Sequence, residues 1–243
     1  MVAGLMYTAD EMKRISLYRC DISSPDEVHT AAEAVRSDHG SPSILINNAG
    51  IGNTHTILDI PPKTLQTLFG VNILGHWYTI QEFLPDMIAK RKGHIMSTSS
   101  MSAWVGFAGA ADYAATKTGL TALHESLAQE LKHRYKCPHI KTSIVYPIWT
   151  KTRMTASIEK GIRQTSQPLM EPEDVAEAMV RQIIAAKSGR IFLGPGIATA
   201  VRALPIWIQE IVRDGMGQIV IGNATTAVAP MPRPVADGSA NGA

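Results

Sequence analysis

The stretch "GHIMSTSSMSAWVGFAGAADYAATKTGL", residues 93–120, predicts a strand followed by a helix. The short apolar run at 93–99 has the length of a buried strand, and the segment from 111 is rich in Ala, Thr and Leu, which favours a helix. Ser100 directly follows the strand. Tyr113 and Lys117 are four residues apart, so they lie on one face of the helix. The stretch therefore indicates one strand-helix unit of an α/β protein.

The same alternation of short apolar runs and longer amphipathic ones continues along most of the chain and predicts a doubly wound parallel sheet. Further strands are expected at 14–20, 43–47, 141–146 and 190–193. Helices are expected after Ser24, where Pro25 and Glu27 complete a capping box, and at 62–90, 111–135 and 172–186. We expect one α/β domain over 1–222 and a disordered Pro- and Gly-rich tail over 223–243.

Composition excludes several classes of protein. The 243-residue chain has a formal net charge of +2 and no long basic run, so we expect no nucleic-acid partner. Its two cysteines lie far apart, which predicts neither a disulfide framework nor a metal site. No signal-peptide pattern and no apolar run long enough to cross a bilayer is found, which predicts a soluble or peripheral protein.

Several polar residues fall where ligands bind in open α/β sheets, at the carboxyl ends of strands. A nearby cation such as Lys117 can lower the pKa of Tyr113 from its free value of about 10. Ser100 ends one strand, and "NNAG" (47–50) ends another, although turns also favour such residues. Asn72 is an odd polar residue in an apolar helix, either bonded to a neighbouring helix or part of the site.

Taken together, these motifs in this order resemble the short-chain dehydrogenase/reductase family, over residues 14–215. The resemblance implies a Rossmann-like fold and an oxidoreductase that uses NAD or NADP. It implies that Tyr113 is the general acid or base, that Lys117 lowers its pKa and binds the nicotinamide ribose, and that Ser100 orients the substrate oxygen. Asn72 would hold a water in a proton relay.

The resemblance also implies further contacts with the cofactor. Asp21, in "CDIS", would contact the adenine, and Asn48, Ala49 and Gly50 would approach the cofactor closely. "YPIWTKT" resembles the segment that holds the nicotinamide carboxamide, which assigns that role to Thr150 and Thr152. The chain departs from the pattern at Ile148, where the family usually has Gly.

The glycine-rich turn that would meet the cofactor pyrophosphate is absent from the sequence. Only thirteen residues precede the expected strand at 14–20, whereas a βαβ unit needs about thirty. We expect an N-terminally truncated sheet in which the edge of 43–47 is unpaired unless "VAGLMY" (2–7) or 14–20 fills the gap. The alternative to an active enzyme is thus an impaired relative that binds cofactor poorly.

The substrate is expected to be apolar, with a retinoid-like, steroid-like or other lipid alcohol or carbonyl as the favoured class. Five large apolar residues fall in segments that should border the crevice: Met101, Trp104, Phe107, Trp149 and Met154. The sequence from 170 to 195 also resembles the branch of the family with retinol and 17-β-hydroxysteroid dehydrogenases.

The resemblance implies a homodimer or tetramer formed through the helices at 62–90 and 111–135. The apolar segment 197–217 is expected to cover the substrate mouth, with contact to a membrane surface as the alternative. We therefore expect a cytoplasmic protein, with association to a membrane or lipid-droplet surface left open.

Overall fold

The computed structural model describes residues 8–164 and 167–221. Within them, parallel strands form one sheet in the order β1-β2-β3-β4. The strands are β1 (Ile44–Asn47), β2 (His94–Thr98), β3 (Lys141–Pro147) and β4 (Gly189–Leu193). The predicted α/β class and four of the five expected strands are therefore confirmed. The expected tail at 223–243 and "VAGLMY" lie outside the described residues.

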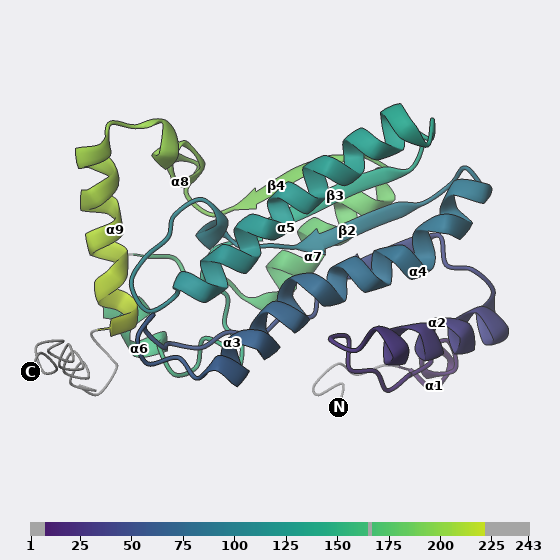
Figure 1. Cartoon of the computed structure of the whole chain (residues 1–243), viewed down its shortest axis with the longest axis horizontal. Helices are drawn as coiled ribbons and strands as arrows, with labels where there is room; N and C mark the ends of the chain where they lie inside the picture. The colour runs from purple at the N-terminus through teal and green to yellow at the C-terminus, as the bar shows by residue number, and fades with distance from the viewer. Residues whose placement is uncertain (1–7, 165–166, 222–243) are drawn as a thin grey trace, which may run out of the picture.

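Helices cover both faces of the sheet, α4 and α5 on one side and α7 on the other (Figure 1). Side chains alternate between faces along a strand, so neighbouring residues of β2 join different cores. Ile95 packs with Leu84 of α4 and Leu127 of α5, whereas Met96 packs with Val175 and Met179 of α7. Burial on both faces explains why the strands read as apolar runs in the sequence.

The three long helical segments expected from the sequence are confirmed. The first is α3 (Pro62–Phe69) and α4 (Gly75–Ala89), joined by a π-helical turn at Gly70–Leu74. The second is α5 (Ala111–Gln129), extended by a π-helical turn at Glu130–Arg134, and the third is α7 (Pro172–Ile184). π-helical turns are frequent at functional sites, and the first one carries Asn72.

The remaining helices and turns complete the described chain. They are α1 (Ala9–Met12), α2 (Pro25–His39), a 3₁₀ turn at Met101–Ala103, α6 (Glu159–Gln164), α8 (Ile197–Ala200), a 3₁₀ turn at Val201–Ala203 and α9 (Ile206–Ile221). None of the described helices is both long and apolar enough to span a membrane.

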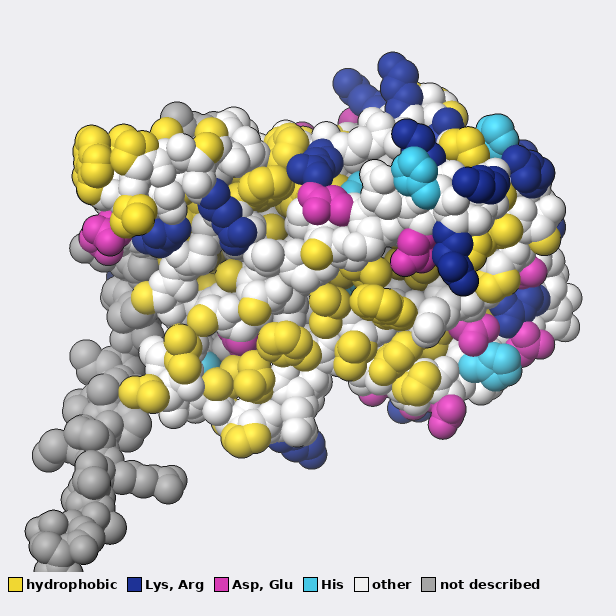
Figure 2. All heavy atoms as spheres, turned by 45° about the horizontal axis from the view of Figure 1, so that its top comes forward, with side chains coloured by type: hydrophobic (Ala, Val, Ile, Leu, Met, Phe, Trp, Pro, Cys, Tyr) yellow, Lys and Arg dark blue, Asp and Glu magenta, His cyan; other side chains and the backbone are white. Residues whose placement is uncertain are grey.

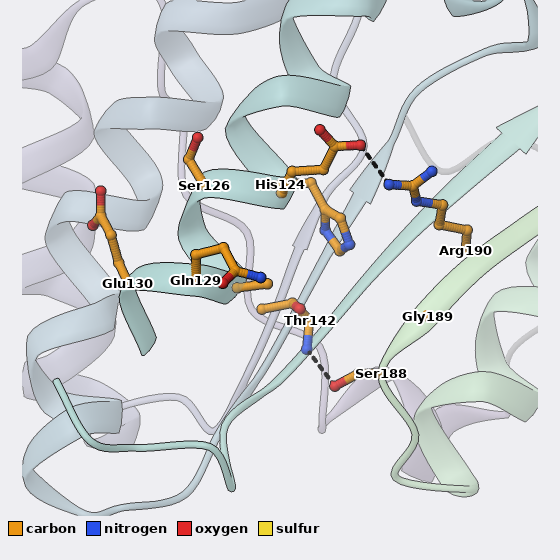
Figure 3. A pocket seen from close by; sticks show the side chains of 10 residues that line it. His124, Ser126, Gln129, Glu130, Thr142, Ser188, Gly189 and Arg190 are labelled. Carbon is orange, nitrogen blue, oxygen red and sulfur yellow. Dashed lines mark hydrogen bonds and ion pairs between the residues drawn. The ribbon is translucent and has the colours of Figure 1, made fainter. Parts of the chain in front are cut away.

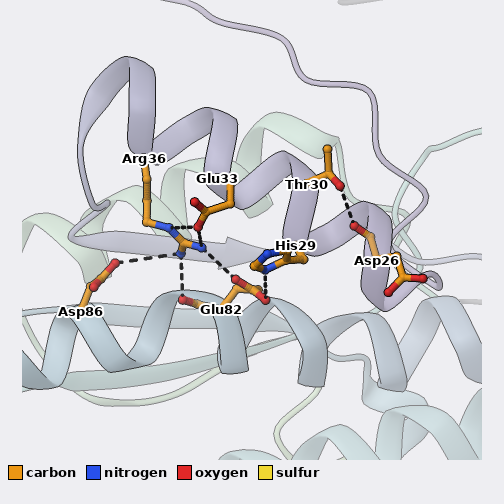
Figure 4. Close-up of polar contacts among 7 residues, drawn as sticks. All are labelled: Asp26, His29, Thr30, Glu33, Arg36, Glu82 and Asp86. Atoms are coloured by element: carbon orange, nitrogen blue, oxygen red, sulfur yellow. Dashed lines mark hydrogen bonds and ion pairs between the residues drawn. The ribbon is translucent and has the colours of Figure 1, made fainter.

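Helix α2 is fixed to α4 by a polar cluster (Figure 4). Arg36 bonds both the carboxylate and the backbone carbonyl of Glu82, and His29 contacts the same carboxylate at 3.0 Å. At the start of α2, the Ser24 hydroxyl accepts from the Glu27 N–H, as predicted. The Glu27 carboxylate, however, accepts from Asp21 N–H and does not complete the capping box.

The prediction of a strand at 14–20 is wrong. Residues 15–21 form no strand, and Leu17 is 80% exposed. A strand needs a partner to satisfy its backbone groups, and this segment contacts α2 instead of the sheet, with Tyr18 bonded to Asp38 and Ser16 to His39. Ile22, just after it, lies against Gly75 of α4. The free edge of β1 is consequently unpaired among the described residues, and Ile44 and Ile46 are each 46% exposed.

The contact between Ile22 and Gly75 can be tested by adding one methyl group. A Cβ on Gly75 would lie 2.8 Å from the Ile22 carbonyl oxygen, so we expect Gly75→Ala to destabilise the fold by about 1 to 3 kcal/mol in urea unfolding. Gly106→Ala is the matched control, since nothing lies within 4 Å of its added Cβ. Equal stability of the two variants would show that the segment before α2 does not cross α4 there.

Candidate active site

Two cavities of similar size lie at opposite ends of the sheet. One, of about 840 Å³, lies where β3 and β4 begin, beside the Glu125–Arg190 ion pair and the bond from Thr142 N–H to Ser188 (Figure 3). The other, of about 960 Å³, lies where β2 and β3 end and contains Ser100, Tyr113 and Lys117. Ligands of open α/β sheets bind at the carboxyl ends of strands, so the second cavity is the candidate site.

Lys117 ties helix α5 to the end of strand β2. Its side chain is almost fully buried, and Nζ donates to the Thr98 carbonyl at 2.9 Å. In return, the Ser99 hydroxyl donates to the Lys117 carbonyl at 3.0 Å. The ammonium lies 5.5 Å from the centre of the Tyr113 ring. These contacts place the phenol, the ammonium and the Ser100 hydroxyl in one cavity, as the sequence predicted.

Burial dominates the electrostatics of this group. It lowers the pKa of Lys117 to about 8 and raises the pKa of Tyr113, while a hydrogen bond with Ser100 opposes the second shift. The net direction for Tyr113 is thus upward in the chain alone, opposite to the lowering that the resemblance implied. A phenol with a raised pKa keeps its proton at neutral pH, so it can donate that proton to a ligand oxygen.

Asn72 lies behind the cavity and does not line it. It is fully buried, its Oδ1 accepts from Ile51 N–H at 2.8 Å, and its Nδ2 donates to the Ile51 carbonyl and to Thr116. A Cβ on Gly50 would lie 3.4 Å from Lys117 Nζ and 3.6 Å from Asn72 Oδ1, at ordinary contact distance, so Gly50 lies directly beside both groups. The Thr116 contact is the bond to a neighbouring helix, α5, that the sequence left open. Asn72 also fixes the loop after β1, a task that sequence reasoning did not identify.

The residues expected to contact the cofactor are only partly brought together. Asn48, Gly50, Thr150 and Thr152 line the cavity. Ala49 does not, and its carbonyl accepts a bond from His76 at 3.0 Å. Asp21 also lies outside the cavity lining, because the strand expected before it does not join the sheet, and its carboxylate accepts from the Ser23 N–H and hydroxyl.

The residues present fit one half of a nicotinamide dinucleotide. Lys117, the backbone at Gly50 and the two threonines line the cavity and suit a ribose and a carboxamide. For the pyrophosphate half, the sequence has no glycine-rich turn. Arg153 is the other Lys or Arg side chain of the described cavity lining, and it was missed because it stands in an irregular loop with no spacing signal.

Most of the expected substrate-contacting residues line the cavity: Met101, Phe107, Trp149 and Met154. Trp104 does not, and that prediction is wrong. The 3₁₀ turn after Ser100 directs Trp104 behind the cavity. There its ring centre lies 5.6 Å from that of Tyr146 and 5.9 Å from that of Phe192. Helix α7 adds apolar lining that was missed, although the spacing of Val175, Met179 and Ile183 is that of one helix face.

The segment 197–217 does not line the cavity within its described residues. Arg202 donates to the carbonyls of Ala103 and Trp104 at 3.1 Å, and α9 packs against α6. Ile158, just before α6, does line the cavity. Helix α9 is therefore an outer layer of the cavity wall, and the expectation that this segment covers the mouth is not met.

Several known proteins are similar to this chain in sequence, and a solved structure is similar to it in fold. Residues 4–163 match the family model described as short chain dehydrogenase. Dehydrogenase RED3 of Cochliobolus heterostrophus is 38% identical over 133 residues, 55% of this chain and 68% of the relative. Human retinol dehydrogenase 10 is 35% identical over 159 residues, 65% of this chain and 46% of the relative.

A solved structure of a metagenomic short-chain oxidoreductase in complex with NADP aligns with a TM-score of 0.57 and 28% identity, covering 72% of each chain. The chain spans only about half the length of several of the relatives it matches, such as 46% of human retinol dehydrogenase 10. A family match over residues 4–163, together with the parallel sheet, shows that the chain belongs to the short-chain dehydrogenase/reductase family.

Proposed function

We propose that this protein transfers a hydride between NAD(P) and the hydroxyl or carbonyl carbon of an apolar substrate. The observation that carries the proposal is the placement of Ser100, Tyr113 and Lys117 in one largely apolar cavity at the ends of β2 and β3. The similar structure that holds NADP supports NADP as one cofactor.

The chain's own residues provide proton transfer and orientation. Bound NAD(P) supplies or accepts the hydride. In the direction of reduction, Tyr113 donates its phenolic proton to the substrate oxygen, and the Ser100 hydroxyl orients that oxygen by a hydrogen bond. Lys117, held by the Thr98 carbonyl, presents its ammonium beside the phenol and stabilises the phenolate that forms.

A lipid-like alcohol or carbonyl is the substrate class that the cavity favours. Met101, Phe107, Trp149 and Met154 line it together with the apolar face of α7. Such linings select apolar ligands and leave orientation to a few polar groups. Several of the similar proteins are retinol dehydrogenases, which agrees with a retinoid-like or steroid-like molecule.

The alternative is an impaired relative that binds cofactor poorly. The observation in its favour is the open side of the site: β1 is an edge strand among the described residues, and its Ile46 lines the cavity and is 46% exposed. The missing glycine-rich turn points the same way, since it removes backbone donors for the phosphates.

We also propose that two copies associate through the face that carries α4 and α5. Four large apolar side chains along α3, the first π-helical turn and α4 are each between 37% and 47% exposed: Leu65, Phe69, Leu74 and Trp77. Figure 2 shows hydrophobic side chains gathered across the lower middle of the molecule, with Lys and Arg along its top and right. For the membrane alternative, α9 offers the exposed side chains Ile206, Trp207 and Ile211.

Tyr113→Phe removes the phenolic proton and leaves the ring. We expect turnover of a lipid aldehyde with NADPH to fall by about 10² to 10⁴, with cofactor affinity within about twofold of the wild type. Tyr135→Phe, at the end of the second π-helical turn, is the control and keeps full turnover. Retained turnover in Tyr113→Phe would remove Tyr113 from the mechanism, and a folded wild type that shows neither NADPH binding nor turnover would favour the alternative.

Trp77→Glu tests the association. A carboxylate in a closely packed apolar interface loses its hydration, so we expect sedimentation velocity to show monomers where the wild type shows dimers. Ile184→Glu changes an exposed residue at the end of α7, on the opposite side of the sheet (Figure 1), and should leave the dimer intact. A wild type that is monomeric at all concentrations, or equal behaviour of the two variants, would contradict this interface.

A further inference from the structure

His76 is a buried histidine that proton transfer does not use. It is the second residue of α4 and is 1% exposed. Its Nε2 lies 3.0 Å from the Ala49 carbonyl oxygen. A carbonyl oxygen can only accept, so Nε2 carries the hydrogen and donates it. Its Nδ1 is buried with no hydrogen-bond partner among the described residues, which fits a neutral ring with a single donor.

The backbone of His76 holds the same loop from its other end. Its carbonyl accepts from Asn47 Nδ2 at 3.3 Å and from the Thr79 hydroxyl at 3.0 Å. That hydroxyl also lies 2.8 Å from Asn47 Oδ1. His76 therefore contacts the residues on both sides of Asn48, which itself lines the cavity and accepts a bond from the Thr98 hydroxyl.

The charge state of the ring suits this contact. Burial lowers the pKa of His76 to about 4, the bond to Ala49 opposes the shift, and the charge of Lys117 adds to it. The ring is thus neutral at physiological pH and adds no second cation beside the ammonium. A neutral donor fixes the carbonyl without disturbing the electrostatics of the proton-transfer group.

We propose that His76 is a positioning residue that holds the Ala49 carbonyl and so presents Asn48 and Gly50 to the cofactor. The inference rests on the proposed function. With the Asn72 bonds to Ile51, the His76 bond anchors the loop after β1 on both sides of Gly50. Without it, the loop would be free to rotate Asn48 away from the cavity, and the cofactor would have to order the loop on binding.

Two substitutions of similar shape isolate the donor. His76→Gln keeps an amide N–H that can reach the carbonyl, whereas His76→Met does not. In the ligand-free chain, we expect the Ile51 amide to exchange its hydrogen about fivefold faster in His76→Met, as loss of one neutral hydrogen bond predicts. The rate is taken relative to the amide of Met96 in β2, which reports global opening. His76→Gln should stay within about twofold of the wild type.

Cofactor affinity is the second readout. Titration with NADPH should give a dissociation constant about fivefold higher for His76→Met and near the wild-type value for His76→Gln. The control is the pair His94→Met and His94→Gln: His94 is 5% exposed and bonds Ser143 at 2.9 Å, on the same strand as Thr98 but at its other end. We expect the His94 variants to change the free energy of unfolding. They should leave the Ile51 exchange rate, relative to that of Met96, and the NADPH dissociation constant unchanged.

The outcomes separate this inference from the proposed function. Equal Ile51 exchange rates in the Met and Gln variants of His76 would overturn the positioning role. So would a loss of NADPH affinity in the His94 variants as large as that in His76→Met. Faster exchange in His76→Met with unchanged NADPH affinity would also overturn it, since the loop would then not serve the cofactor. A wild type that binds neither NADPH nor NADH would refute the proposed function. The relative Ile51 exchange rates would then still test whether the His76 bond to Ala49 holds the loop.

Discussion

The hydrogen bond from Lys117 Nζ to the Thr98 carbonyl is the contact on which the site depends. It buries an ammonium at the junction of β2 and α5, and burial lowers the pKa of Lys117 to about 8, so the contact has a cost in free energy. In return, it fixes the start of α5 against the end of the strand. Tyr113 and Ser100 then face one cavity although they are thirteen positions apart in the sequence.

Much of this arrangement could be predicted from the sequence, because strand length, helix periodicity and the spacing of Ser100, Tyr113 and Lys117 are local signals. The segment 14–20 shows the limit: its residues favour a strand, but strand formation needs a neighbour, which no local pattern reports. Trp104 failed for a similar reason, since the 3₁₀ turn after Ser100 decides which way it points. The tasks of Asn72 and His76 depend on residues more than twenty positions away.

The two ends of the cofactor site are unequally equipped. The end near Lys117 has the buried ammonium and a loop fixed by Asn72 and His76. Strand β1 is the edge of the sheet among the described residues, and its Ile44 and Ile46 are about half exposed. Each charge-assisted hydrogen bond to a phosphate contributes roughly 1.5 to 3 kcal/mol, so the lack of a glycine-rich turn should weaken binding by several orders of magnitude.

Calorimetric titration of the 243-residue chain with NADPH and with NADH tests this account most directly. A folded, monodisperse sample should bind one equivalent of cofactor with a dissociation constant well above the micromolar range, because the nicotinamide end alone contributes contacts. Micromolar or tighter affinity for either cofactor would contradict the account, since the chain would then bind the pyrophosphate without the glycine-rich turn.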